Sequence, residues 1–237
     1  MRFLLNQQKA DLVVDQILAD IRRTRYSVGQ SMPSEAELAE TYNVSRLTVR
    51  EAVKYLASRG VLDVGHGRRN RIAPATQWSV LDPDIAILRG KLTGDEIAWA
   101  LDLMEARSIV EIGAVVLAAS RVTSEQLDQL GHLLKRMDAQ ESVDDVVKAD
   151  MAFHRLIFEA ANNSYITATY ETLEAILLSI RQRTSSSEKV RLEAQHWHHA
   201  IYRALRNGDA AAARQAMEEH MSQTRTAVHE TLISKEK

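Results

Sequence analysis

Apolar positions near the start of the chain repeat with the period of an α-helix. Within residues 7–24 the apolar stripe consists of Leu12, Val13, Ile17 and Ile21. Residues three and four apart share one helix face, so this stripe predicts an amphipathic first helix. Gly29 then ends the connection to the next helical segment.

Two further helices are predicted in quick succession. Ser34 and Glu37 have the spacing of a capping box, in which the serine side chain accepts from a free backbone N–H and the glutamate reaches back. They open a short helix over 34–41. Ser45 is a second N-cap and starts a helix over 46–58. Helices joined by so short a turn cross steeply, as in a helix-turn-helix.

The second of these helices has one apolar and one polar face. The apolar face consists of Val49, Ala52, Val53 and Leu56, which we expect in the core. The opposite surface shows Leu47, Arg50, Glu51 and Lys54, with Arg46 and Thr48 beside its first turn. If this helix lies in the major groove of DNA, its first residues contact bases and phosphates. We expect one of Arg46 and Arg50 to read guanine and the other to bind phosphate.

A small hairpin is predicted after Gly60, which follows the helix where a left-handed residue is favoured. Its strand candidates are residues 61–64 and 70–73. Between them lies the tip, which consists of Gly65, His66, Gly67, Arg68 and Arg69. Such a tip can approach a sugar-phosphate backbone closely, and its arginines offer charge for it. The alternative is a hairpin without function that exposes a solvated run of charge.

The pattern changes after the hairpin. Residues 74–84 hold two of the three prolines and no helical period, with Trp78 and Leu81 as apolar anchors, so they predict an ordered linker. Beyond Gly94 the chain has no proline and a helical pattern throughout. Helices are predicted over 94–120, 123–139, 143–161, 164–184, 188–207 and 209–232. Helices of this length form an antiparallel bundle.

The predicted fold is therefore mainly α, with an N-terminal winged helix-turn-helix followed by an all-helical antiparallel bundle. The predicted domains are 1–75 for DNA binding, 76–93 as a linker and 94–237 as the bundle. Residues 1–75 hold 12 Lys and Arg against 8 Asp and Glu, whereas the remainder holds 18 against 24. A basic first part is expected when one domain binds a polyanion and the other does not.

Four residues of the predicted bundle are expected to converge. Asp150 and His154 stand four apart, so they project from one helix face. His198 lies 10 residues before Gly208 and His220 lies 12 after it, so the two come level in an antiparallel hairpin. An aspartate and three neutral imidazoles form a coordination set for a divalent transition ion, Zn first, with Mn or Ni as alternatives. The plainer alternative is four polar residues that are hydrogen-bonded or half exposed.

Arg107 borders the apolar stripe of the first bundle helix. Its guanidinium is suited to bind a carboxylate through two hydrogen bonds, so one interpretation is contact with a small bound anion. The other is a surface ion pair with Glu111, four residues further along. Arg181 is a third candidate for contact with an anion.

The chain resembles GntR-superfamily transcription regulators of the FadR branch over nearly its whole length. The motifs are P-S-E-x-E-L-A at 33–39, V-S-R-x-T-V-R-E-A at 44–52, L-x-x-x-G at 56–60 and G-H-G at 65–67. The resemblance implies that the DNA contacts are Ser34, Glu35, Ser45, Arg46, Leu47, Thr48, Arg50, His66, Gly67 and Arg68. Two positions depart from the family pattern, since Ala36 replaces a frequent arginine and Leu47 a frequent polar residue.

The resemblance also covers the bundle. The FCD-type domain of that branch has a metal set written D-x-x-x-H, H, H, which implies the ligands Asp150, His154, His198 and His220. The P-S-E-A-E-L form and the sequence Q-W-S-V-L-D-P-D are similar to regulators of galactonate catabolism, which implies a sugar-acid effector. Arg107, Glu111 and Arg181 are then the expected effector contacts.

These features predict a cytoplasmic, homodimeric repressor that binds an inverted-repeat operator in double-stranded DNA and is released by a small carboxylate. The sequence has no apolar run of about 18 residues, no signal-peptide core and no cysteine, so we expect no membrane span, no export and no thiolate site. We expect no enzyme activity. Two rivals are a helical metal-dependent hydrolase, for which no general base stands out, and an effector-independent DNA organiser.

Overall fold

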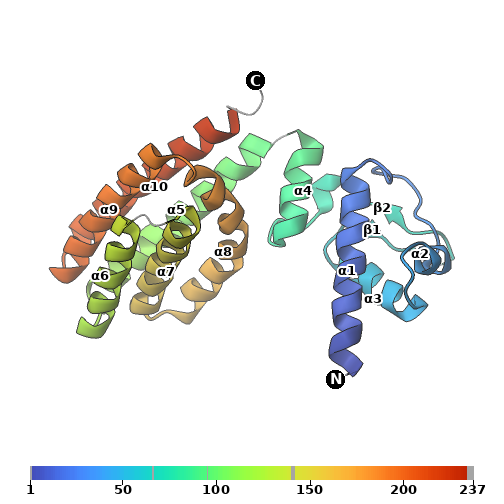
Figure 1. Cartoon of the computed structure of the whole chain (residues 1–237), viewed down its shortest axis with the longest axis horizontal. Coiled ribbons are helices and arrows are strands. Elements are labelled where there is room, and N and C mark those ends of the chain that lie inside the picture. The colour runs from blue at the N-terminus through green and yellow to red at the C-terminus, as the bar shows by residue number, and fades with distance from the viewer. Residues whose placement is uncertain (1, 66, 95, 140–141, 234–237) are drawn as a thin grey trace. The chain divides into compact units, whose positions relative to one another are not determined.

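The computed structural model describes residues 2–65, 67–94, 96–139 and 142–233, which are mostly helical (Figure 1). The chain forms two compact units, Met1–Asp95 and Glu96–Lys237. Each unit has a hydrophobic core of its own. Within the described ranges, no helix combines the length and the apolar character that a membrane crossing requires.

The first unit is a winged helix-turn-helix. Its elements are α1 (Arg2–Arg22), α2 (Glu35–Thr41), α3 (Arg46–Ser58), β1 (Leu62–Asp63), β2 (Arg71–Ile72), the 3-10 helix η1 (Ala75–Gln77) and α4 (Pro83–Thr93). The capping box is present: the Ser34 hydroxyl accepts from the Glu37 N–H at 3.2 Å, and the Glu37 carboxylate accepts from the Ser34 N–H at 2.6 Å. Ser45 caps α3 by accepting from the Thr48 N–H at 3.1 Å. These local bonds start both helices at the predicted residues.

The core of the first unit lies where α1 packs on α3. Val13, Ile17 and Ile21 are each 2% exposed or less, and the predicted apolar face of α3 is buried. Leu12, expected in the same stripe of α1, is instead 61% exposed. Each helical residue is rotated by about 100° from the last, and Leu12 therefore falls outside the face that Val13 and Ile17 share.

The wing is an antiparallel hairpin of two-residue strands, shorter than predicted. Its register pairs Leu62 with Ile72 and Asp63 with Arg71. The segment before α2 runs beside β2, because Ser31 forms a bridge with Arg71 and the Met32 N–H donates to the Asn70 carbonyl at 2.7 Å. The sequence pattern does not predict that this segment pairs with the wing, since its hydrogen-bond partners are distant along the chain.

The predicted linker over 76–93 is wrong, because helix α4 occupies most of it and packs in the core of the first unit. Ile85 and Leu88 are 0% and 2% exposed. Asp82 caps α4 by accepting from the Ile85 N–H at 3.3 Å, and Pro83 is in its first turn. Proline at the first helical position favours a helix start, which here outweighs its usual effect as a breaker.

Trp78 and Leu81, the two expected anchors, differ in the structure. Trp78 is 2% exposed and its indole N–H donates to the Ala73 carbonyl at 2.9 Å. Leu81 is 55% exposed and anchors nothing. The turn before Trp78 also lies against Gly60, at the end of α3.

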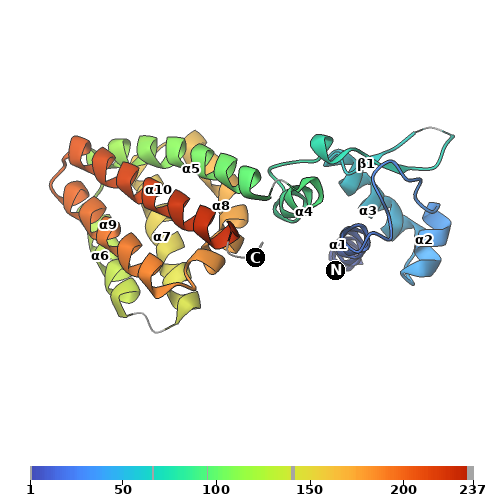
Figure 2. The ribbon, with the colours of Figure 1, turned by 90° about the horizontal axis from the view of Figure 1, so that it is seen from above.

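The second unit is an all-helical bundle, as predicted. Its helices are α5 (Glu96–Ala119), α6 (Ser124–Ala139), α7 (Val143–Ala161), α8 (Ser164–Thr184), α9 (Glu188–Arg206) and α10 (Ala210–Ile233). Helix α10 packs along α5 and α9, while α7 packs on α5, α6 and α8 (Figure 2). Helices α9 and α10 form a hairpin around Gly208, whose φ of +66° is the left-handed conformation that glycine favours.

We expect Gly60→Ala to destabilise the first unit more than Gly29→Ala. Both glycines have left-handed φ angles, +73° and +80°, where alanine costs about 1–2 kcal/mol. A Cβ atom at Gly60 would also lie 2.3 Å from the backbone oxygen of Gln77, whereas one at Gly29 would meet no atom within 4 Å. Urea unfolding followed by circular dichroism measures the free energy of unfolding. Equal losses in the two variants would contradict the close packing at Gly60.

Candidate functional site

The start of α3 exposes the residues that are predicted to read DNA. Arg46 is exposed, and Leu47 is 55% exposed. Arg50, about one turn further, is also exposed, and its Nη2 atom lies 3.1 Å from the Glu35 Oε2 atom on α2. The four residues therefore belong to one accessible surface of the helix-turn-helix.

The other predicted DNA contacts have more varied positions. Ser34 and Ser45 are exposed, and both hydroxyls accept from backbone N–H groups at helix starts. Thr48 is not on the accessible surface, contrary to expectation, because it is 2% exposed and its hydroxyl hydrogen bonds with that of Ser45 at 2.8 Å. Gly67, at the wing tip, has a φ of +74°. His66 lies outside the described residues.

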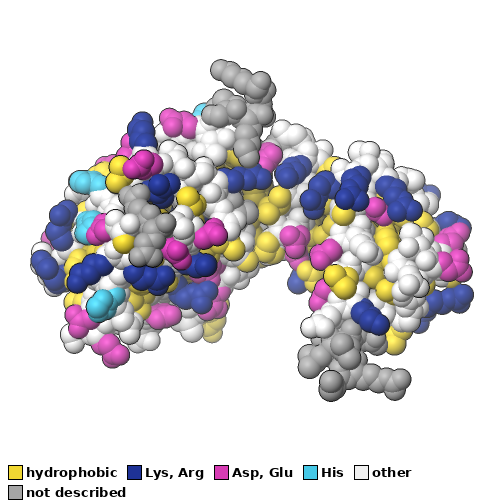
Figure 3. Space-filling model, viewed as in Figure 1, with side chains coloured by type: hydrophobic (Ala, Val, Ile, Leu, Met, Phe, Trp, Pro, Cys, Tyr) yellow, Lys and Arg dark blue, Asp and Glu magenta, His cyan; other side chains and the backbone are white. Residues whose placement is uncertain are grey.

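Arginines of the wing are paired with carboxylates. Arg68 lies 2.8 Å from Asp63, and Arg69 lies 3.2 Å from Glu37. Figure 3 shows basic and acidic side chains interspersed over the first unit. Exposed ion pairs contribute only about 0–1 kcal/mol. DNA phosphates can therefore replace these carboxylates at small cost.

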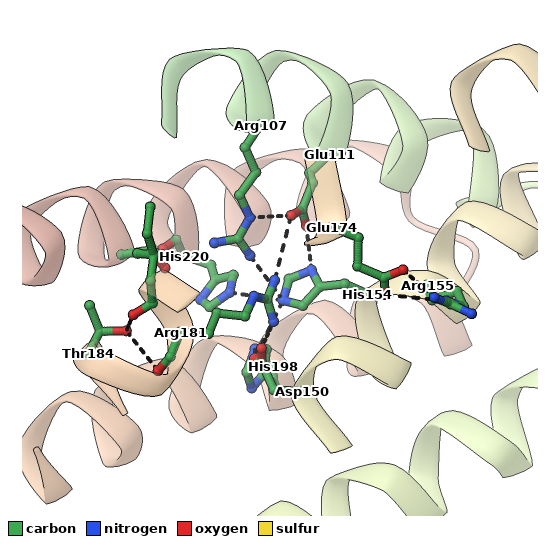
Figure 4. A network of polar contacts seen from close by, with 12 residues as sticks. Arg107, Glu111, Asp150, His154, Arg155, Glu174, Arg181, Thr184, His198 and His220 are labelled. Carbon is green, nitrogen blue, oxygen red and sulfur yellow. Dashed lines mark hydrogen bonds and ion pairs between the residues drawn. The ribbon is translucent and has the colours of Figure 1, made fainter. Parts of the chain in front are cut away.

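The bundle brings together the four predicted metal ligands (Figure 4). Asp150 and His154 lie on α7, His198 on α9 and His220 on α10. One ligand atom from each residue lies within 4.8 Å of the others. The imidazoles are 0–2% exposed and the Asp150 side chain is 17% exposed. The i, i+4 spacing on α7 and the similar distances of His198 and His220 from Gly208 along the chain together explain this convergence.

The individual separations fit a small cation. His154 Nε2 lies 3.2 Å from His220 Nε2, and Asp150 Oδ1 lies 3.1 Å from His198 Nε2 and 3.7 Å from His154 Nε2. Tetrahedral ligands about 2.0–2.1 Å from zinc are separated by about 3.3–3.4 Å. Nitrogen and carboxylate oxygen are also the donor types that zinc accepts. The residues present therefore fit a divalent metal ion.

Two arginines and a glutamate surround this cluster. The Glu111 carboxylate accepts from Arg107 Nε and pairs on its other oxygen with His154 Nδ1. Arg107 and Glu111 are 2% and 1% exposed, so their pair is buried and is not the surface pair that the sequence left open. Arg181 Nη1 pairs with Asp150, and its Nη2 lies 4.0 Å from Glu111.

Burial determines the protonation of the cluster. It lowers the pKa of His154, which Glu111 partly opposes, and it lowers the pKa values of His198 and His220 well below their usual range, helped by neighbouring histidines. For Glu111 burial acts against ionisation, but the charge of Arg107 and the contact with His154 hold its pKa below the usual range. The three imidazoles are therefore neutral at pH 7 and can act as ligands, beside an ionised Glu111.

A cavity of about 50 Å³ adjoins the cluster. Its polar lining includes Arg107, Arg181, Thr184, Gln195, Gln223 and Thr224. A water molecule takes up about 30 Å³ in the liquid, so the cavity as it stands holds one or two waters. A larger ligand requires side chains such as Arg181 to move.

The sequence interpretation missed Gln195, which lies three residues before His198 on the same face of α9. Gln195 is 8% exposed, and its Oε1 atom lies 3.1 Å from His198 Nδ1. Its amide nitrogen donates to the Leu134 carbonyl on α6 at 3.1 Å. The i, i+3 spacing from His198 was the available signal.

A winged helix-turn-helix joined to a helical unit with a buried ligand cluster defines a DNA-binding regulator, not an enzyme. Residues 9–72 match the bacterial regulatory proteins of the gntR family, and residues 102–223 match the FCD domain. The chain belongs to the gntR family of transcription regulators and carries an FCD domain.

The chain is similar to curated proteins over most of its length. The galactonate operon transcriptional repressor of Escherichia coli (strain K12) is 28% identical over 88% of this chain and 91% of its own length. The HTH-type transcriptional repressor NanR of Enterobacter sp. (strain 638) is 27% identical over 96% and 88%. The solved structure of Lar from Listeria monocytogenes aligns with a TM-score of 0.63 over 93% of this chain and 96% of that one. At 17% identity, that likeness shows the fold alone.

We expect Arg46→Ala and Arg50→Ala each to weaken binding to the operator by about 1–3 kcal/mol, since each removes a base or phosphate contact. A fluorescence anisotropy titration on a fragment selected from genomic DNA measures the affinity. Arg214→Ala on α10, where the side chain is about half exposed and paired with Glu218, is the control. Unchanged affinity in both α3 variants would refute this DNA interface.

The metal-free protein should lose stability as pH falls from 7.5 to 5.5. Below about 6.5, histidines of the unfolded chain take up protons, whereas burial keeps His198 and His220 neutral in the folded state. The unfolded state then binds more protons, so the free energy of unfolding falls by up to about 1.4 kcal/mol per pH unit for each buried histidine. Glu111 does not contribute in this window because its pKa is lowered.

Urea unfolding at several pH values, with a metal chelator present, measures how the free energy of unfolding depends on pH. The double variant His198→Gln, His220→Gln should show a shallower slope. Equal slopes for the double variant and the unchanged protein would contradict the neutral state of these imidazoles.

Proposed function

We propose that this protein is a homodimeric repressor whose two winged units bind an inverted-repeat operator and release it when a small carboxylate binds at a divalent metal ion in the bundle. One recognition helix per half-site follows from the symmetry of such operators. The sense of regulation and the sugar-acid class of effector are supported by the relatives, which are named as repressors of the galactonate operon and as NanR repressors.

The observation that carries the metal site is the free electron pair of His154, which faces the other ligand atoms. Its Nδ1 atom faces the ionised Glu111 carboxylate, which can only accept a hydrogen bond, so Nδ1 carries the proton of the neutral ring. The bare Nε2 atom therefore points at Asp150 Oδ1, 3.7 Å away, and at His220 Nε2, 3.2 Å away. Arg107 Nη2 lies 3.4 Å from the same Nε2 atom, and an Nε2–H of His220 could also donate to it. A cation bound between the ligand atoms would take up this electron pair instead.

Asp150, His154, His198 and His220 would hold the ion. Their oxygen and nitrogen donors suit zinc, with manganese and nickel as alternatives. When bound, the metal supplies a positive charge and coordination positions for a carboxylate oxygen. Glu111 orients His154 from behind, as carboxylates commonly do for ligating histidines.

Charge balance supports an anionic effector. Arg107 and Arg181 are balanced by Glu111 and Asp150, and the histidines are neutral, so the metal-free cluster has no net charge. A divalent ion brings the buried site to about +2, and buried charge requires a counter-ion. A carboxylate supplies this charge, and its planar oxygens match a guanidinium.

Arg181 is the residue that can exchange partners. Its guanidinium nitrogens are buried and make no hydrogen bond within the described residues, although Nη1 pairs with Asp150. Once Asp150 binds metal, Arg181 can turn to the effector carboxylate. Thr184 and Gln223 beside it offer hydrogen bonds to hydroxyls, which fits a sugar acid.

Release of DNA requires that the effector bind more tightly to an arrangement of the dimer that does not match the operator. An effector shifts an equilibrium only by its difference in affinity for the two states. A coupling free energy of about 1–3 kcal/mol is typical of such regulators. Effector binding and operator release are then coupled through one equilibrium between two states of the dimer.

The double variant His198→Ala, His220→Ala should bind no zinc, because two of four ligands are lost. Metal content after dialysis, measured by mass spectrometry, tests this. The same variant should lose the rise in melting temperature that galactonate gives to the zinc-loaded protein, since a ligand that prefers the folded state stabilises it by mass action.

His196→Ala, His229→Ala is the matched control, because these histidines are exposed on α9 and α10, outside the cluster. Full zinc retention by the His198, His220 variant would refute the metal site. Zinc binding without stabilisation by galactonate, other sugar acids or dicarboxylates would leave the metal site standing and refute the carboxylate effector.

A further inference from the structure

We infer that Gln195 is a positioning residue that holds His198 in the tautomer whose Nε2 atom is free to bind the metal. The inference rests on the metal site of the proposed function. It concerns a residue outside the four ligands that contacts the His198 ring, and it follows from hydrogen-bond polarity.

The first step fixes the orientation of the Gln195 amide. Its Nε2 atom lies 3.1 Å from the Leu134 carbonyl oxygen and 2.8 Å from Asp138 Oδ1, both on α6. A backbone carbonyl and an ionised carboxylate both accept hydrogen bonds and cannot donate them. The NH₂ group must therefore face α6, because the flipped amide would place its oxygen against two acceptors.

The second step follows for His198. With NH₂ toward α6, the Gln195 Oε1 atom faces His198 Nδ1 at 3.1 Å. An amide oxygen can only accept, so His198 Nδ1 carries a hydrogen. A ligating imidazole offers the metal its bare nitrogen, and with Nδ1–H toward Gln195 that nitrogen is Nε2. The bare Nε2 then points at Asp150 Oδ1, 3.1 Å away.

The third step shows that this tautomer needs support. Without metal, Asp150 favours the opposite tautomer, because an Nε2–H could donate to its carboxylate. That tautomer would turn the bare Nδ1 toward the Gln195 oxygen, so that two acceptors would meet. Gln195 therefore opposes the state that Asp150 favours and keeps the ligand atom of His198 available for an ion.

The hydrogen bonds that hold Gln195 continue to the surface of the bundle. Asp138, which accepts from Gln195, also lies 3.1 Å from His199 Nε2, and both side chains are nearly half exposed. Helix α6 supplies none of the four metal ligands, yet through Leu134 and Asp138 it determines the state of a ligand on α9. Glu111 has the corresponding role for His154, whereas His220 Nδ1 has no hydrogen-bond partner within the described residues.

Gln195→Leu should lower zinc affinity about 10- to 100-fold, the usual effect of removing a group that orients a ligating histidine. Competition with a zinc-binding dye measures the affinity of the full chain. Gln215→Leu, the same change at an exposed position on α10, should leave it unchanged. The double variant Gln195→Glu, Asp138→Asn keeps an acceptor at His198 and gains a donor on α6, but it leaves an oxygen facing the Leu134 carbonyl, so we expect it to regain part of the affinity.

Nitrogen NMR of the metal-free protein gives a second readout that a merely structural role would not move. The His198 ring should carry its hydrogen on Nδ1 in the unchanged protein and shift toward Nε2 in Gln195→Leu. His198→Ala identifies the signal by its loss. An Nε2–H ring in the unchanged protein would overturn the inference even if a variant failed to fold.

Failure of this inference can be told apart from failure of the metal site. If His198→Ala binds zinc as tightly as the unchanged protein, the proposed metal site is wrong. If His198→Ala loses zinc while Gln195→Leu keeps both full affinity and the Nδ1–H ring, the metal site stands and the role of Gln195 is overturned.

Discussion

The second unit depends on the ionic contacts of the buried Glu111 carboxylate. It joins Arg107 of its own helix to His154 of α7, with Arg181 of α8 nearby, so three helices meet at one negative charge. Removing one partner from a buried ionic set costs several kcal/mol, because an unpaired charge remains in a medium of low polarity. The bundle must therefore keep this set together. The same requirement fixes the direction of the His154 ring, whose Nε2 atom faces Asp150 and His220.

The two units use charge in opposite ways. In the first unit, Arg50, Arg68 and Arg69 pair with carboxylates at the surface, where such pairs are weak and exchange readily. A polyanion can then displace the carboxylates. Around the ligand cluster of the second unit, the pairs of Arg107 and Arg181 with carboxylates are buried, so solvent cannot screen them. Solvent exposure thus separates the surface of the DNA-binding unit from the buried cavity in which we propose that a small molecule binds.

The sequence predicted most helices well, since capping residues and apolar period are local properties. Ser34, Glu37 and Ser45 start their helices as expected, and the bundle helices begin and end within two residues of their predicted bounds. The predictions were wrong at residues whose local sequence pattern fits more than one structure. Pro83 marks the start of α4 instead of a break, and Leu12 and Thr48 lie on faces that differ from those assigned by spacing.

The convergence of Asp150, His154, His198 and His220 could be expected from sequence, because helical spacing and the hairpin at Gly208 determine which side chains come level. The burial of Arg107 with Glu111 and the role of Gln195 could not. Whether a polar side chain is paired in the interior depends on groups from other helices, such as Leu134 and Asp138 for Gln195. Spacing along one chain thus determined which residues share a face. Only tertiary packing decided which of them were buried away from water and therefore required hydrogen-bond or ionic partners, because desolvation is a property of the assembled bundle.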